Sequence, residues 1–350
     1  MNYLKTSLTS IALAMGLTAC GSSIDTDDSS SDNQTQAAQF SLGVSDAAVE
    51  SAAEVNIFVR QVILRNGNGE DTIIDTLDDN DQATKINLLD FQGSQAYELI
   101  TDLQVEAGDY QWIRMDLVNG VENNLTLTSH IVFEDASIRP LVVTRKGNDG
   151  IGEIQLNNFA LNEGNNEFVV EFDLKRSLVD PKNNSEIKLK PTGVRLANQT
   201  ESGHIAGTIS SEVIGACEVD HAVNAGQGGE FGHAVYLYAD DVSADATVDI
   251  NESDDHKSVS PLATATLSLN AESGNYEFEM GYVGEGNYEL GYTCLSHLDD
   301  AETIDDDFSL YAYQNNIQVE AQVTANIALG IDQVIFVDVD SNNQTERPAQ

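Results

Sequence analysis

The feature that most constrains the fold is a series of short runs of β-branched and aromatic residues, separated by clusters of glycine, asparagine and aspartate. Such runs form strands, and this spacing is typical of antiparallel β domains. Helical periodicity is hard to find, and only residues 86–91 are expected to form one short turn. The strands expected in the first half include residues 55–59, 113–118, 125–127, 168–172 and 187–189.

Strict alternation predicts further strands in the second half. Residues 276–280 read Tyr-Glu-Phe-Glu-Met, so one face should enter a core and the other should meet water. The last strand is expected over 333–339, and Cys294, which continues the register of 288–292, should point inward. The same alternation occurs in residues 234–238, 265–269 and 288–292.

A glycine, an asparagine or aspartate, and a tyrosine occur together three times, at 108–110, 274–276 and 286–288. The first two residues suit a turn, and the tyrosine can open a strand with its ring on the core and its hydroxyl near backbone. This device resembles the tyrosine corner of immunoglobulin-like sandwiches. We therefore expect these tyrosines to pack rather than to bind a ligand.

The predicted fold is all-β, with two consecutive β-sandwich domains. The polar segment 197–203 marks the boundary, so the domains should span 39–198 and 203–340. Residues 20–38 contain little to bury and are expected to be a disordered tether, and residues 341–350 a disordered tail.

The charge of the chain excludes some partners. With 58 acidic and 16 basic residues, the formal net charge is -42. Such a surface repels nucleic acid and anionic lipid headgroups, because both require the opposite sign of charge. Attachment to a membrane should therefore not come from a basic patch.

The N-terminal segment combines Lys5 with a short apolar run over 11–19, and Cys20 and Gly21 follow. This arrangement resembles the lipobox of bacterial lipoproteins. The resemblance implies cleavage of a signal peptide at residues 1–19 and lipidation of Cys20, with acyl chains such as palmitate. Gly21 implies sorting to the outer membrane, with a periplasmic or surface-facing body. An ordinary secretory signal that leaves Cys20 as a free thiol is the alternative.

Two further cysteines, Cys217 and Cys294, are left for pairing in an oxidising compartment. A disulfide between them is expected, and two free buried thiols are the alternative. Neither cysteine belongs to a C-x-x-C pair, so the sequence predicts neither a zinc site nor redox catalysis.

The first block resembles the DUF4382 domain, a family of unknown function in exported bacterial and archaeal proteins. The resemblance covers about residues 39–198, and it implies a fold but no activity. Ala48 departs from the pattern, since a proline usually follows the Asp-Ala of the family's Ser/Thr-Asp-Ala-Pro motif. The segments that carry the resemblance are 40–47, 55–65, 86–90, 108–115, 166–174 and 189–191.

The second block resembles transthyretin-like modules related to carboxypeptidase regulatory domains. Residues 203–209, 233–238 and the hairpin 274–293 carry this resemblance. A generic immunoglobulin-like sandwich is the alternative.

No catalytic motif stands out, so no catalytic residue is predicted. Ser185 and Lys188 satisfy S-x-x-K, but on a strand two positions three apart face opposite ways. The histidines show no i, i+4 pair, and they are expected to be scattered on the surface: His130, His204, His221, His233, His256 and His297.

Acidic clusters lie in predicted loops and contain the oxygen ligands that calcium prefers. Solvated loops are the simpler interpretation, so no metal site is predicted, and weak collective calcium binding is left open. Residues 338–342 begin like a calcium loop but lack its glycine and closing glutamate. The clusters are Asp78 to Asp81, Asp240 and Asp241 with Asp245, Asp254 and Asp255, and Asp299 and Asp300 with Asp305 to Asp307.

These features together predict a non-catalytic lipoprotein of the cell outer membrane that binds a glycan, a protein or a cation. The membrane should be reached through the lipid on Cys20, and no cofactor is expected. A hydrolase acting on extracellular polymers and a structural spacer are the alternatives. Convergent acids in one concavity would favour the hydrolase.

Mass spectrometry of the processed amino terminus tests the anchor. We expect acyl chains on Cys20, because the cysteine lies where lipidation requires it. An unacylated terminus, with the mature protein free in the culture fluid, would contradict this prediction.

Overall fold

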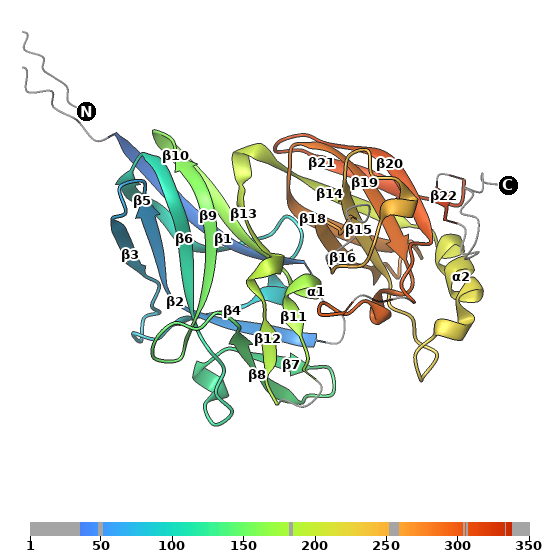
Figure 1. The fold of residues 1–350 in the computed structure, drawn as a ribbon, viewed down its shortest axis with the longest axis horizontal. Helices are drawn as coiled ribbons and strands as arrows, with labels where there is room; N and C mark the ends of the chain where they lie inside the picture. Colours follow the sequence, from blue (N-terminus) through green and yellow to red (C-terminus); the bar gives the residue numbers. More distant parts are fainter. Residues whose placement is uncertain are drawn as a thin grey trace, which may run out of the picture. The chain divides into compact units, whose positions relative to one another are not determined.

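Strands make up most of the part of the chain that the computed structural model describes, namely residues 36–47, 52–181, 185–251, 259–303, 305, 307–332 and 334–337. These strands lie in four sheets (Figure 1). The predicted all-β fold is therefore confirmed. Cys20, the signal 1–19, Ala48 and the tail 341–350 lie outside the described residues.

Two sheets enclose the first core, and together they are called the first sandwich. The smaller sheet has the order β13-β10-β1-β5. Its strands are β1 (Ala37–Ala47), β5 (Tyr97–Glu106), β10 (Gly164–Asp173) and β13 (Val194–Asn198). β1 pairs in parallel with β10 and antiparallel with β5, so the expectation of purely antiparallel pairing is wrong here. β1 begins within the range expected for the tether.

The larger sheet has nine strands, and the 15-residue β2 is its centre. β2 pairs with β3, β4, β6 and β7 along different parts of its length, so one strand organises most of the sheet. The strands are β2 (Ala52–Asn66), β3 (Asp71–Asp75), β4 (Thr84–Asn87), β6 (Gly108–Val118), β7 (His130–Phe133), β8 (Ile138–Val143), β9 (Ile151–Leu161), β11 (Leu178–Val179) and β12 (Ile187–Leu189).

The first core follows from the period-two pattern of these strands. Phe40, Leu42 and Val44 of β1 point to the same side as Phe168 and Phe172 of β10, and all are buried. The larger sheet contributes alternate residues of β2 and β6 to the same cluster. Each such side chain stabilises the fold by about 1.5–3 kcal/mol relative to an exposed one.

The second sandwich has a four-stranded sheet, β17-β18-β14-β21, and a five-stranded sheet, β16-β15-β19-β20-β22. β14 pairs in parallel with β21 and antiparallel with β18. The strands are β14 (Ser202–Ile209), β15 (Ala234–Ala239), β16 (Ala263–Thr266), β17 (Ser268–Leu269), β18 (Tyr276–Gly284), β19 (Gly286–Thr293), β20 (Ala312–Val319), β21 (Thr324–Leu329) and β22 (Ile335–Phe336).

β15 departs from the predicted pattern of one buried and one solvated face. Val235 and Leu237 enter the core between the two sheets, whereas Tyr236 and Tyr238 enter a separate cluster on the other side. Residues of the loops after β15 and β19 cover that second side, so both faces are buried. Leu269, in contrast, is 59% exposed although its alternation predicted an inward side chain.

The short helices were only partly predicted. Residues 125–127 form a 3-10 helix, η2 (Leu125–Leu127), not the expected strand, whereas η1 (Leu88–Asp90) lies inside the expected turn. The sequence showed no sign of α2 (Ser211–Asp220), although Ser210 accepts from the Val213 N–H as its N-cap. The others are α1 (Leu174–Ser177), η3 (Pro191–Gly193), η4 (Gln199–Glu201), η5 (Ala222–Asn224), η6 (Ala244–Ala246) and η7 (Ser296–Leu298).

Two of the three predicted tyrosine corners form. Tyr110 Oη donates to the Glu106 carbonyl, and Tyr288 Oη donates to the Gly284 carbonyl, each at 2.8 Å. Each bond ties a tyrosine to the backbone four residues before it, which fixes the turn between two strands. The hydrogen bonds of the described residues give Tyr276 no corresponding partner.

Residues 173–195 fasten the first sandwich to the second. Lys175 Nζ donates to the carbonyl oxygens of Ser296 at 2.7 Å and Asp299 at 3.4 Å. Asp173 accepts from the backbone N–H and the hydroxyl of Thr264, both at 2.8 Å. Hydrogen bonds from charged groups are about twice as strong as neutral ones, so this junction is firm. Three more cations donate to carbonyls: Arg176 to Leu262, Lys190 to Ala301 and Arg195 to Gly281.

Cys217 of α2 and Cys294, directly after β19, form a disulfide, with 6.1 Å between their Cα atoms. Both cysteines are fully buried, so Cys294 does point inward. The bond ties α2, a helix at the edge of the fold, to the core of the second sandwich.

Removing this bond should destabilise the second sandwich. The cysteines are 77 positions apart, and the chain-entropy model assigns a loop of that length roughly 4–5 kcal/mol, from which native strain subtracts. We expect the double variant Cys217→Ala/Cys294→Ala to lose about 3–5 kcal/mol in denaturant unfolding. Added reductant should lower the stability of the wild type and leave that of the variant unchanged. Equal stability of the two proteins without reductant would contradict the prediction.

Candidate functional site

One predicted acidic cluster gains a partner through the fold. Asp299 and Asp305 lie close to Asp249, and the three residues are called the acidic triad. One carboxylate oxygen of each lies within 4.8 Å of the other two. Sequence reasoning did not single out Asp249, because it is far from the other two along the chain. The remaining clusters stay apart among the described residues, and Asp254, Asp255 and Asp306 lie outside them.

Hydrogen bonds from the chain itself account for this acidic triad. Tyr236 Oη donates to Asp299 Oδ2 at 2.6 Å, and the Asp305 N–H donates to Asp249 Oδ2 at 2.6 Å. Asp305 itself accepts from the Asp300 N–H at 2.7 Å. The carboxylates therefore hold the loop after β15 against the loop after β19. The triad is explained by this structural role, and no calcium site is assigned to it.

Burial changes the acidity of Asp299. Loss of hydration raises its pKa to about 6, although the nearby Lys175 ammonium and the Tyr236 hydroxyl both oppose this. The carboxyl group therefore exchanges between charged and neutral forms near pH 6.

The DUF4382-like motif places a second buried acid at the end of β1. Asp46 is 1% exposed, and its carboxylate oxygens have no hydrogen-bond partner among the described residues. Burial, with the charges of Asp173 and Glu171 nearby, raises its pKa well above the usual value. The fold therefore favours the neutral form of Asp46, and its buried position points to packing.

A groove lies where the two sandwiches meet, and it is called the junction groove. Its volume is about 610 Å³. The lining residues are Gln92, Gly93, Gln95, Ala206, Gly207, Thr208, Ala265, Thr266, Ser268, Glu277, Phe278, Glu279, Asn326, Ile327 and Ala328.

The floor of the junction groove is the outward face of the sheet β17-β18-β14-β21. Ala206 and Thr208 of β14 form a low centre, because their side chains are short. Beside them, Glu279 pairs with Ala206 and Glu277 with Thr208, so both carboxylates rise from β18 on the same side. Asn326 of β21 pairs with Ala206 on the other side. The floor is therefore a trough with carboxylates along one side and an amide on the other.

The loop that follows η1 forms one wall of the groove and is held in place by backbone contacts. A side chain at Gly281 would collide with the carbonyl oxygen of Gly93. The loop and β18 can therefore lie this close together only because residue 281 is glycine. Tyr282 Oη donates to the Ser94 carbonyl at 2.9 Å, and Arg195 holds the Gly281 carbonyl. The wall that carries Gln92 and Gln95 is thus attached to the floor.

The lining suits a ligand rich in hydroxyl groups. Carboxylates accept strong hydrogen bonds, amides both donate and accept, and hydroxyls do the same. None of the lining residues is lysine or arginine. Glu277 accepts from Asn270 Nδ2 at 2.7 Å, which orients one of the two carboxylates.

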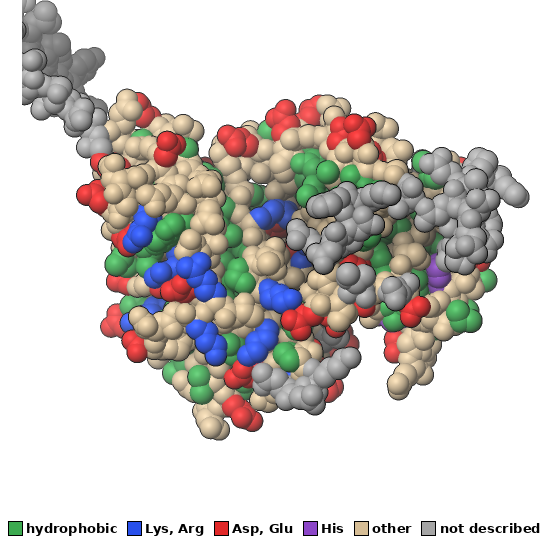
Figure 2. All heavy atoms as spheres, in the orientation of Figure 1, with side chains coloured by type: hydrophobic (Ala, Val, Ile, Leu, Met, Phe, Trp, Pro, Cys, Tyr) green, Lys and Arg blue, Asp and Glu red, His purple; other side chains and the backbone are tan. Residues whose placement is uncertain are grey.

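Basic side chains gather elsewhere. Between residues 196 and 350 the sequence contains only Lys257 and Arg347, neither of them among the described residues. Figure 2 accordingly shows lysine and arginine over the first sandwich. On the outer face of the larger sheet, Trp112 lies between Arg65 and Arg114, whose guanidinium carbons are 4.7 and 5.7 Å from its ring centre.

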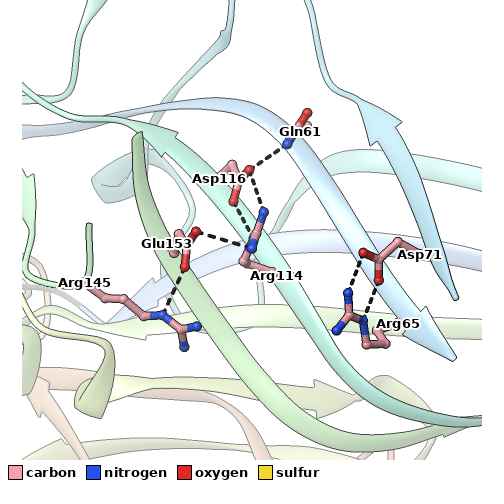
Figure 3. A network of polar contacts seen from close by, with 7 residues as sticks. All are labelled: Gln61, Arg65, Asp71, Arg114, Asp116, Arg145 and Glu153. Atoms are coloured by element: carbon pink, nitrogen blue, oxygen red, sulfur yellow. Dashed lines mark hydrogen bonds and ion pairs between the residues drawn. The ribbon is translucent and has the colours of Figure 1, made fainter. Parts of the chain in front are cut away.

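These arginines are already paired (Figure 3). Arg65 makes two hydrogen bonds to Asp71, and Arg114 contacts both Asp116 and Glu153. Arg145 contacts Glu153 as well. Three arginines therefore face three acids, and the network offers no net positive charge to an anion.

The histidines do not form a metal cluster among the described residues. His233 contacts Tyr292 Oη at 2.9 Å and Glu218 at 3.2 Å, while His297 accepts from the Gly232 N–H at 3.0 Å. His130 and His221 are buried, so a general surface location was wrong for these two. His256 lies outside the described residues, and Lys188 pairs with Glu186 rather than with Ser185.

Most of the first sandwich matches a known protein family. Residues 37–191 match the family model of DUF4382, a domain of unknown function. The predicted resemblance of the first block to this family is therefore confirmed. The DUF4382 match includes Lys175, Arg176 and Lys190, which fasten the junction.

Two solved structures are similar over most of the chain. One is a candidate adhesin from Bacteroides ovatus, at 8% identity and a TM-score of 0.19, covering 90% of this chain and 99% of that one. The other is a fimbrial protein from the same organism, at 8% identity and a TM-score of 0.17, covering 85% and 49%. At these TM-scores the likeness supports no argument about function. A search of curated proteins found no match.

The raised pKa of Asp299 predicts a pH dependence of stability. Because the folded protein binds this proton more tightly than the unfolded chain, the stabilisation is complete below pH about 4 and is lost as pH rises through about 6. We expect Asp299→Asn to flatten the fall in unfolding free energy over that range, by at most about 3 kcal/mol. Denaturant unfolding from pH 4 to 8 measures this. A variant whose curve stays parallel to that of the wild type would contradict it.

Proposed function

We propose that this chain is a non-catalytic binding module of the cell envelope and that an uncharged, hydroxyl-rich glycan binds in the junction groove. The observation that carries the proposal is the lining of the groove, in which carboxylates, amides and hydroxyls surround a trough of short side chains. A glycan chain lying along the trough would meet Glu277 and Glu279 on one side and Asn326 on the other.

The arrangement of the acids favours binding over hydrolysis. Glycoside cleavage requires two carboxyl groups on opposite sides of the bond that breaks. Glu277 and Glu279 are two positions apart on one strand and face the same way, so they contact the same side of a ligand. This geometry suits paired hydrogen bonds to neighbouring hydroxyl groups. We therefore prefer a binding module to an extracellular hydrolase.

The net charge of -42 further restricts the ligand. An anionic polymer would be repelled over the Debye length of about 8–10 Å, and nucleic acid is disfavoured for the same reason. A neutral glycan carries no such penalty. The firm junction between the sandwiches also favours a preformed groove over a simple spacer, because a spacer needs no lined cavity.

We place the protein at the outer membrane, anchored by acyl chains on Cys20. The lipobox-like sequence supports this location, and the structure describes no residue before Gln36. None of the described helices has the length and hydropathy that a membrane-spanning helix requires. We also keep a transthyretin-like relationship for the second sandwich as a proposal.

Filling the trough should abolish binding. In Ala206→Trp the new ring would occupy the low centre of the floor without entering the core, since Ala206 faces outward. We expect loss of glycan binding in calorimetric titrations against a panel of neutral oligosaccharides. Glu277→Ala/Glu279→Ala should weaken binding at least about tenfold, because two charge-assisted hydrogen bonds disappear.

The matched control is Gln104→Trp, which puts the same ring on an exposed position of β5, away from the groove. This variant should bind like the wild type, and all variants should melt within a few degrees of it. Undiminished binding by Ala206→Trp, or no binding of any neutral glycan by the wild type, would overturn the proposal.

A further inference from the structure

A second cavity lies in the first sandwich, between the edge strands of its two sheets. β9 ends the larger sheet and β13 ends the smaller one, so neither strand has a further neighbour on this side among the described strands. The space between them has a volume of about 580 Å³ and is called the seam cleft. Its lining residues are Gln155 to Ala160, Asn162, Phe168, Pro191, Val194, Leu196, Asn198 and Glu201.

The lining combines amides with an apolar floor. Five residues carry side-chain amides: Gln155, Asn157, Asn158, Asn162 and Asn198. Beneath them lie Phe159 and Phe168, whose rings meet edge to face at 5.6 Å, with Leu156 and Leu196 alongside. Glu201 is the one charged residue of the lining. The cleft is thus nearly uncharged, in contrast to the junction groove.

Several of these amides are free to meet a ligand. Among the described residues, the side chains of Asn158 and Asn162 make no hydrogen bond to the protein, and both are exposed. Asn198 Oδ1 accepts from the Thr200 N–H at 3.0 Å as a helix cap, and the hydrogen bonds of the described residues include none from its NH₂ group. Asn158 adopts a left-handed backbone conformation, with φ of 58°, and it has no partner in the β6–β9 ladder, although the register is the same on both sides of it.

The conformation of Asn158 matters for the kind of ligand. Edge strands can accept an additional strand, but a left-handed residue interrupts the extended row of backbone donors and acceptors. We therefore look to side chains for recognition in the seam cleft. Amides bind other amides well, since each can donate and accept at once, and phenylalanine rings favour a methyl group or the apolar face of a sugar ring.

We propose that the seam cleft binds sugars that carry an acetamido group. The acetamido N–H and C=O would pair with the free asparagine amides, and its methyl group would pack on Phe159 and Phe168. An anionic or cationic ligand would find no opposite charge except at Glu201. This site lies in the DUF4382-matching part of the chain and its immediate continuation, and it does not depend on the junction groove.

Trp112 provides a local reporter. It is the only tryptophan of the chain, and its strand β6 pairs it with Asn157 of the cleft lining. Side chains of directly opposite residues lie about 4.5–5.5 Å apart, so we expect a ligand that contacts Asn157 to change the surroundings of the ring. The junction groove contains no tryptophan, so ligand binding there leaves the emission of Trp112 unchanged.

The test titrates the full-length protein with an oligomer of N-acetylglucosamine and, separately, with the matching glucose oligomer. The acetylated oligomer should shift the tryptophan emission, and the glucose oligomer should not. Asn158→Gly/Asn198→Asp should weaken binding at least about tenfold, since two amide donors are lost. Glycine tolerates the left-handed backbone at 158, and aspartate keeps the Oδ1 cap at 198, so the variant should fold.

The control is Glu277→Ala/Glu279→Ala, which alters the junction groove and should leave the emission response intact. Equal responses to both oligomers, no response to the acetylated one, or unchanged affinity in the asparagine variant would each overturn the proposal. Failure of binding at the junction groove alone would leave the emission response in place, so the two proposals fail separately.

Discussion

Cations that bind backbone carbonyls across the junction are the interaction on which the rest of the structure depends. Lys175, Arg176, Lys190 and Arg195 all come from one short stretch at the end of the first sandwich, and each reaches a carbonyl of the second. The described part of the second sandwich has no lysine or arginine of its own. Without these contacts, two acidic bodies would repel each other.

The junction also creates the groove. Arg195 and Tyr282 attach the loop that carries Gln92 and Gln95 to the outward face of β18 and β14, so residues from distant parts of the chain line one cavity. The same cations approach the loop that contains Asp299, whose buried carboxyl group joins it to Asp249. The attachment of the two sandwiches and the shape of the groove therefore share one physical cause, which is charge placed at a polar interface.

Local patterns predicted the strands well where side chains alternate strictly, as in β18, and predicted the corners at Tyr110 and Tyr288. They failed where tertiary packing overrides alternation. β15 is buried on both faces because loops cover its outer side, and α2 is held by its N-cap and by the disulfide rather than by a clear apolar stripe. Parallel pairing of β1 with β10 was also unpredictable, since it joins residues more than a hundred positions apart.

By itself, the sequence determined the all-β class, the inward cysteine, the strongly negative charge and the absence of familiar catalytic motifs, because these depend on composition or on neighbours along the chain. Only the tertiary structure decided which acids meet, that Gly281 must be glycine, and that Gln92 and Asn326 line one groove. It also brought the amides of β9 opposite Asn198. The reason is that these arrangements are set by strand order and by the junction, and neither is encoded in any local stretch of sequence.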